Sequence, residues 1–157
     1  MSVTMKSSPA SSGAMAIARI VIGFMFIMFA QYKLLHSDFA HGGYAHYVNG
    51  WLDSTAVSFY KPFLRATLRY QVASGYTVGV AEMLIGVSMV LGFAVRPFAV
   101  VGALFMFNLL LCTWNLPAGT PAWRYLGNQL ETIPLMLLFL LFFVHGAGST
   151  WGLDGRK

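Results

Sequence analysis

Long apolar runs constrain the fold of this 157-residue chain more than any other feature of its sequence. A helix needs about 20 apolar residues to cross a bilayer core about 30 Å thick. Runs of this kind cover residues 14–33, 76–95 and 97–114, and the uncharged stretch 133–144 completes a fourth when it is extended to 126–145. We therefore predict an all-α, integral membrane protein. Its single domain, residues 1–157, would be a four-helix transmembrane bundle.

The composition supports a membrane protein and excludes several other classes. Charged residues make up only 10% of the chain, whereas a soluble domain carries roughly a quarter. Cys112 is the single cysteine, so the chain can form no internal disulfide and holds no thiolate-bound zinc or iron–sulfur cluster of its own. The net charge of +5 is scattered among apolar runs, which favours lipid head groups over nucleic acid as the partner.

The segments outside the runs predict two tails and one long loop. Residues 1–13 are rich in serine and predict a flexible N-terminal tail, and residues 146–157 form a C-terminal tail. The loop, residues 34–75, contains a predicted interfacial amphipathic helix at about 62–73, because Lys61, Arg65 and Arg69 recur on one helical face. We expect these three side chains to contact lipid head groups. An ordinary solvated helix is the alternative.

The first run has a competing interpretation as a cleaved secretory signal peptide. No small-x-small cleavage site follows it, and Gln31-Tyr32-Lys33 closes it instead, so we expect a retained helix.

Four spans place both termini on one side of the membrane, and the basic residues divide five against five between the two sides. The positive-inside rule therefore does not separate the two orientations. We expect cytoplasmic termini in a bacterial inner membrane, because the loop cations belong largely to the interfacial helix.

Polar side chains inside the spans are the candidate binding residues, since a charge there costs roughly 2.5 to 3.5 kcal/mol on insertion scales. At 1.5 Å of rise per residue, each of the four spans places one polar residue in the same half of the membrane. The candidates are Lys33, Glu82, Asn108 and Glu131, with Gln31 and Asn128 close by. We expect a pocket for the head group of a lipid-soluble ligand. It would open toward the loop side and be rimmed by Trp51, Trp114 and Trp123.

A purely structural role for Glu82 is the alternative, in which a cation pairs with it and ties the helices together. Arg19 and Arg96 are the candidates for such structural ion pairs.

The sequence contains no recognisable catalytic motif: no nucleophile lies beside a base, and no glycine-rich phosphate loop is present. His36, His41 and His46 recur every five residues and share no helical face. The sequence thus predicts no catalytic residue, no metal ligand and no cofactor held by ligands of its own.

Several of these residues together resemble a known family. The second span carries Glu82-Met83-Leu84-Ile85-Gly86, then Leu91-Gly92 and a closing Arg96, and the chain ends on a glycine-rich segment that closes on Leu153-Asp154. This order resembles the DoxX-like family of small four-span membrane proteins, related to the DoxD subunit of thiosulfate:quinone oxidoreductase. Ala30 departs from the pattern, where a glycine is expected. The resemblance implies a four-helix bundle and points to Arg19, Lys33, Glu82 and Arg96.

The resemblance leaves three functions open, because the family includes relatives linked to thiosulfate:quinone oxidoreductase, to membrane redox systems and to no assigned activity. We favour a non-catalytic accessory subunit of a larger membrane redox or electron-transfer complex, with other membrane subunits and lipid as partners. In this interpretation the polar pocket lines a quinone or lipid site, and quinone is the candidate ligand. A quinone-reactive subunit of a thiosulfate:quinone-type oxidoreductase is the alternative, and a small-molecule or lipid carrier is the third function.

Overall fold

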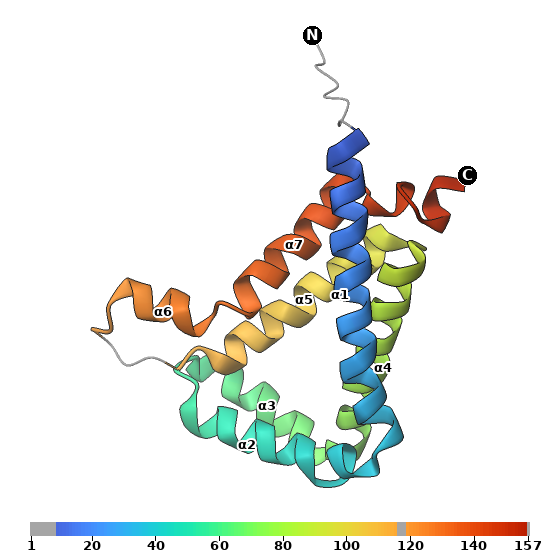
Figure 1. Ribbon diagram of the computed structural model, residues 1–157. Coiled ribbons are helices and arrows are strands. Elements are labelled where there is room, and N and C mark those ends of the chain that lie inside the picture. The colour runs from blue at the N-terminus through green and yellow to red at the C-terminus, as the bar shows by residue number, and fades with distance from the viewer. Residues whose placement is uncertain (1–8, 116–118, 157) are drawn as a thin grey trace.

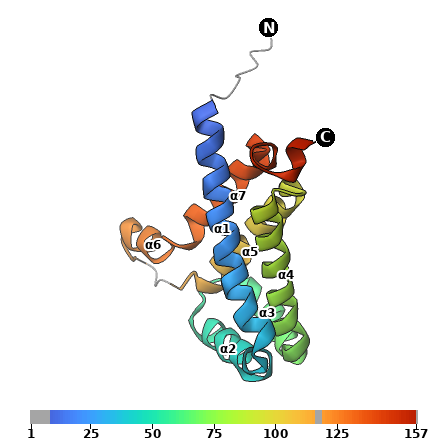
Figure 2. The same cartoon turned by 45° about the vertical axis from the view of Figure 1, so that its right-hand side comes forward.

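The computed structural model describes residues 9–115 and 119–156, and this part of the chain is helical with no strand. Three helices are long and apolar enough to cross a membrane: α1 (Pro9–Leu35), α4 (Gln71–Leu91) and α5 (Val95–Thr113). The apolar helix α7 (Thr132–His145) is shorter. The helices pack in pairs, α1 beside α4 and α5 beside α7 (Figures 1 and 2). The predicted all-α membrane fold is confirmed.

Glycines allow each helix pair to approach closely. A Cβ atom added at Gly86 of α4 would lie 2.8 Å from the carbonyl oxygen of Gly23 in α1, so the two backbones touch at this level. A Cβ atom at Gly102 of α5 would lie 2.6 Å from the ring of Phe139 in α7. The Phe139 ring also meets Phe26 of α1 edge to face, with centroids 5.4 Å apart. This aromatic contact joins the two pairs in one core.

The C-terminal tail closes the hairpin between α4 and α5. Gly92 ends α4 with a φ of +63°, and the Asp154 carboxylate accepts the N–H groups of Ala94 and Val95 at 2.8 and 2.9 Å. Asp154 thereby caps the start of α5, where a negative charge is favoured. Short 3₁₀ turns at Ala147–Ser149 and Leu153–Arg156 form the tail. The beginning of α1 and the tail therefore lie at the same end of the molecule (Figure 1).

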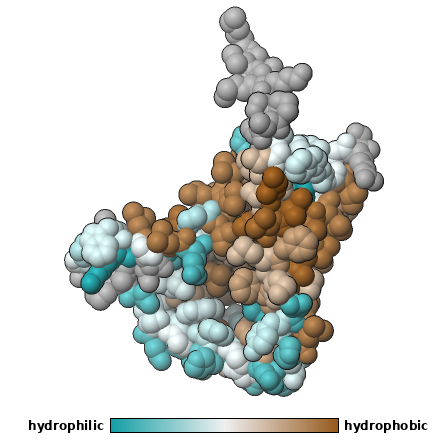
Figure 3. Space-filling view, in the orientation of Figure 1, coloured by the Kyte–Doolittle hydropathy of each residue, from teal (hydrophilic) through white to brown (hydrophobic). Residues whose placement is uncertain are grey.

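Four helical segments cross the opposite end of the bundle (Figure 1). They are η1 (Phe39–Gly43), α2 (Tyr44–Ser54), η2 (Ser58–Tyr60) and α3 (Lys61–Arg69), and we call them the base. Val48 of α2, Leu64 of α3 and Cys112 of α5 pack together in a second apolar core. Polar surface gathers over the base, whereas apolar surface covers the helices above it (Figure 3).

Several predicted boundaries differ from the structure. Residues 9–13 belong to α1 and not to the predicted tail, whose residues 1–8 lie outside the described part. The interfacial helix ends at Arg69, because Tyr70 leaves helical geometry, and residues 71–75 begin α4. α5 begins at Val95, two residues before Pro97. The predicted long loop, residues 34–75, is largely helical, and its Gly42 and Gly43 lie in the helical segment Phe39–Gly43.

The fourth span differs most. A separate helix, α6 (Ala122–Asn128), precedes α7 and projects sideways from the bundle (Figures 1 and 2). Between them the buried Gln129 donates its side-chain amide to the Thr113 carbonyl at 3.1 Å, which ties the turn to the end of α5. Pro134 then falls in the first turn of α7, where its missing N–H is not needed. The predicted continuous helix from Leu126 is therefore wrong, and α7 covers only about 21 Å.

Candidate functional site

A cavity of about 360 Å³ lies between the long helices and the base. Its walls come from α1, η1, α2, α3, α4 and α5. Most of the side chains that line the cavity are aromatic or aliphatic. The charged and amide side chains among them are Lys33, Glu82 and Asn108. The remaining lining residues are Phe29, Tyr32, Phe39, Tyr44, Tyr47, Trp51, Phe63, Leu64, Val78, Phe105, Leu109 and Cys112.

An ion pair forms the charged part of the wall. Lys33 Nζ, near the end of α1, donates to Glu82 Oε1 in the middle of α4. The Glu82 side chain is 7% exposed and that of Lys33 is 19% exposed. Lys33 Nζ also lies 5.3 Å from the centroid of the Phe39 ring, within cation–π range. The close approach of α1 and α4 thus lets each charge neutralise the other inside the membrane domain.

Only one oxygen of Glu82 takes part in this pair. Oε2 is buried and has no hydrogen-bond partner among the described residues. Buried acceptors in proteins are almost always satisfied, so an unsatisfied one requires an explanation.

Asn108 of α5 forms the amide part of the wall and is bonded to the base. The Tyr60 hydroxyl donates to Asn108 Oδ1, which leaves the side-chain N–H groups of Asn108 as donors for another acceptor. Tyr60 lies outside the membrane-spanning helices, and burial raises the pKa of its hydroxyl to about 12. The hydroxyl therefore remains a protonated donor at neutral pH.

A second cavity, of about 180 Å³, lies between α1, α5 and α7. Glu82 lines this cavity as well as the first, and Phe29, Phe105 and Leu109 complete the wall that they share. Glu131 lines the second cavity from the turn before α7, where it is exposed. The two glutamates that the sequence places at one level therefore border the same space.

The structure brings together some of the predicted binding residues and not others. Lys33, Glu82 and Asn108 line one cavity, and Glu131 lines its neighbour. Gln31 lines neither cavity and donates to Met28 Sδ on the outside of α1 at 3.4 Å. The side chain of Asn128 lies outside the described residues.

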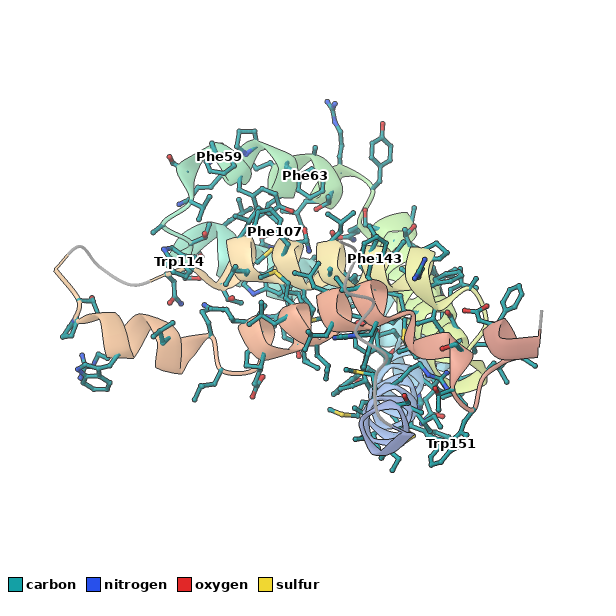
Figure 4. All side chains as sticks on the ribbon, turned by 90° about the horizontal axis from the view of Figure 1, so that it is seen from above. Phe59, Phe63, Phe107, Trp114, Phe143 and Trp151 are labelled. Carbon is teal, nitrogen blue, oxygen red and sulfur yellow. The ribbon has the colours of Figure 1, made fainter. Side chains whose placement is uncertain are left out.

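The base lies on the loop side of this cavity, and Tyr44, Trp51 and Leu64 of α2 and α3 form part of its wall there; the opening toward the loop side stays a prediction. Trp51 of α2 lines the cavity, whereas Trp123 projects on α6 and is 69% exposed. Trp114 follows the end of α5 and does not line the cavity. Figure 4, which looks down on the bundle, shows α3 with Phe63 alongside α5 with Phe107 and Trp114 beyond the end of α5.

The two predicted arginines lie away from Glu82. Arg19 is completely buried and donates to the Met89 carbonyl at the end of α4 and, at 3.3 Å, to the Trp151 carbonyl in the tail. Arg96 is exposed in the first turn of α5, beside Gly146 at the end of α7. The residue paired with Glu82 is Lys33, a residue that the sequence analysis treats as a ligand donor.

The base presents a basic outer surface. Leu64 of α3 is buried against the cavity, whereas Arg65 and Arg69 are exposed and Lys61 is half-buried. This arrangement suits a helix that lies at a membrane surface, and the lipid contacts stay a prediction.

Sequence reasoning predicted Trp51 at the site but missed Tyr44 and Tyr47 of the same helix, α2, and the contact of Tyr60 with Asn108. Tyr44, Tyr47 and Trp51, which line the cavity, are spaced by three and four residues, which is the pattern of one helical face. Tyr60 carries no local signal that predicts its bond to Asn108, because the two residues are 48 positions apart. Among the described residues no group of three or more His, Cys, Asp or Glu side chains lies close enough to hold a metal ion.

The comparison with protein families is consistent with this fold. A model of the DoxX family matches residues 14–114, more than half of the chain. The matched range contains Arg19, Lys33, Glu82 and Arg96, whereas the glycine-rich tail lies beyond it. Comparisons with curated proteins and with solved structures found no match. With its long apolar helices, this chain is an integral membrane protein that belongs to the DoxX family.

Proposed function

We propose that this DoxX protein is an accessory subunit of a membrane redox complex and that its cavity holds the head group of a quinone-type lipid. The observation that carries the proposal is the cavity of about 360 Å³ with the Lys33–Glu82 pair and Asn108 in an otherwise apolar wall. Ligand sites have volumes of about 300 to 1,000 Å³ and combine apolar walls with a few polar groups.

The chemistry of the wall suits a flat ring that carries oxygen atoms. Lys33 has N–H groups beyond the one bonded to Glu82, and the Asn108 amide has two N–H groups besides the oxygen that accepts from Tyr60. Both can donate to ring oxygens. Trp51 and Tyr44 supply aromatic faces against which a ring packs.

An accessory role is supported by two features of the C-terminal half. α7 covers about 21 Å, less than the bilayer core of about 30 Å. α6 projects from the bundle and exposes Trp123 and Leu126. A neighbouring membrane subunit packed against α6 and α7 would cover these surfaces, and in this proposal it supplies the electrons for any reaction of the quinone.

The proposed setting is a bacterial inner membrane with cytoplasmic termini. The start of α1 and the tail lie at one end and the base at the other, so the base would face the opposite aqueous side. Arg65 and Arg69 on α3 would there contact anionic lipid head groups.

Tryptophan fluorescence tests the binding site directly. Trp51 lines the cavity, and Trp151 is exposed in the tail at the other end of the molecule. A short-tailed quinone added to the protein in detergent should quench fluorescence saturably, and Trp51→Phe should remove the saturable component. Trp151→Phe should retain it. Quenching that rises without saturation, or that is unchanged in Trp51→Phe, would contradict the site.

Isolation from native membranes tests the subunit role. In a mild detergent the protein should elute with other membrane subunits, and mass spectrometry should identify a redox protein among them. Elution as a stable, monodisperse monomer would contradict the accessory role while leaving the binding site to stand on the fluorescence result.

A further inference from the structure

We infer that the cavity selects the reduced, hydroxyl-bearing form of the head group, with Glu82 Oε2 accepting a hydrogen bond from the ligand hydroxyl. This inference rests on the proposed function and specifies the chemical form of its ligand.

The two oxygens of Glu82 have different surroundings. Oε1 accepts from Lys33, whereas Oε2 is buried and has no partner among the described residues. An ionised carboxylate only accepts hydrogen bonds, so the missing partner must be a donor. A buried acceptor without a donor is unfavourable, and a donor entering the site would remove that cost.

Glu82 lies in the wall of a cavity large enough to hold a ligand. Glu82 lines the cavity of about 360 Å³, which its neighbours Lys33 and Asn108 also line. Arg19 Nε is likewise buried and has no hydrogen-bond partner in the described part of the chain, but Arg19 lines neither of the two cavities. Of these two buried atoms, Glu82 Oε2 is therefore the one that belongs to a residue of the cavity wall.

The redox form of the head group decides whether that donor exists. An oxidised quinone ring presents carbonyl oxygens, which only accept and would meet a second acceptor at Glu82. A hydroquinone presents O–H groups at the same positions. One O–H can donate to Oε2, and its oxygen can accept from the Lys33 ammonium or the Asn108 amide. Because the site favours one form, binding shifts the equilibrium of the bound couple toward hydroquinone.

Water in the second cavity is the competing partner for Oε2. That cavity also reaches Glu82, and Glu131 at its other side is exposed. Its remaining walls are apolar apart from Thr132. If water reaches Oε2 from this side, the oxygen needs no ligand hydroxyl and the site has no reason to prefer the reduced form.

A series of three probes tests the inference in the wild-type protein. The probes are an alkyl hydroquinone, the matching quinone and the matching hydroquinone dimethyl ether, measured anaerobically by equilibrium dialysis against protein in detergent. A hydrogen bond to a charged group is worth about 1.5 to 3 kcal/mol, so the hydroquinone should bind about 10- to 100-fold more tightly than either other probe. Equal binding of all three probes would overturn the inference but leave the proposed function standing. No binding of any probe would overturn the proposed function itself.

Two glutamate variants locate the preference. Glu82→Gln should reduce the preference for hydroquinone to within a few-fold, because an amide can present an N–H where the carboxylate accepts. Glu131→Gln, the same change in the second cavity, should keep the preference. Loss of the preference in Glu131→Gln, or its retention in Glu82→Gln, would assign the selectivity to another group. Should Glu82→Gln fail to fold, the three probes on the wild-type protein still decide.

Discussion

Replacing Lys33 by methionine should destabilise the protein far more than a surface lysine substitution does. Methionine keeps the apolar stem but removes the ammonium group that neutralises Glu82. The carboxylate side chain is only 7% exposed, so it cannot recover its charge stabilisation from water. Removal of one partner of a buried ion pair costs 3 to 5 kcal/mol, and we expect about 3 kcal/mol because Lys33 is partly exposed. This cost corresponds to a shift of roughly 100-fold in the unfolding equilibrium.

Removal of the other partner, Glu82, should destabilise the protein less than removal of Lys33, and this difference in cost identifies the pair. Glu82→Gln should cost only about 1 kcal/mol, because the Lys33 side chain is 19% exposed and can reach water. The double variant Lys33→Met/Glu82→Gln contains neither charge and should lie within about 1 kcal/mol of the wild type. Lys61→Met on α3 is the matched control and should change stability by under about 0.5 kcal/mol.

The assay is reversible unfolding of the purified protein in mixed micelles with increasing SDS, followed by circular dichroism. It yields the free energy of unfolding for all four variants and hence a coupling energy for the pair. A Lys33→Met cost below about 1 kcal/mol, or a double variant whose cost equals the sum of the two single costs, would refute the claim of a buried, mutually dependent pair.

Further predictions concern the packing around the site. Arg19→Met should lower the free energy of unfolding by about 2 to 4 kcal/mol, because it leaves carbonyl groups of α4 and the tail without their donor. Limited proteolysis should then cut the tail of the variant, and an uncut tail would contradict the contact between Arg19 and the tail. Gly86→Val should prevent the close approach of α1 and α4 and reduce the yield of monodisperse protein, whereas Gly50→Val, where a Cβ atom meets nothing within 4 Å, should not. The raised pKa of Tyr60 means that its stabilising contribution is complete below about pH 10 and is lost as the pH rises toward about 12. Tyr60→Phe should therefore reduce the loss of stability between these two pH values, and an unchanged profile would contradict the burial of this hydroxyl.

The sequence was most informative where a pattern is local and long. The runs at 14–33, 76–95 and 97–114 correspond to α1, α4 and α5, because twenty apolar residues with few charges have few alternatives to a membrane helix. It was least informative at the ends of the fourth span. There the helix start depends on the hydrogen bond between Gln129 and Thr113, a contact between two helices that no local pattern encodes.

In the candidate site, too, the sequence predicted the level of the polar residues but not their partners. Depth counting along each span placed Lys33, Glu82 and Asn108 near one level, and all three line one cavity. The choice of partners could not be obtained in this way, because depth says nothing of the direction in which a side chain points. Gln31 is two residues from Lys33 and therefore lies on another face of α1. Tyr60 reaches Asn108 only because the base folds back across the bundle.

Photolabelling with an aryl-azide quinone tests the central claim, that the cavity beside the Lys33–Glu82 pair holds a quinone-type head group, most directly. The protein is irradiated with the probe in native-like lipid, and the labelled peptides are identified by mass spectrometry. We predict labels on cavity residues such as Tyr44, Trp51 and Asn108 that disappear when excess unlabelled hydroquinone is present. Labels confined to the outer faces of α1 and α7, and unchanged by the competitor, would contradict the claim.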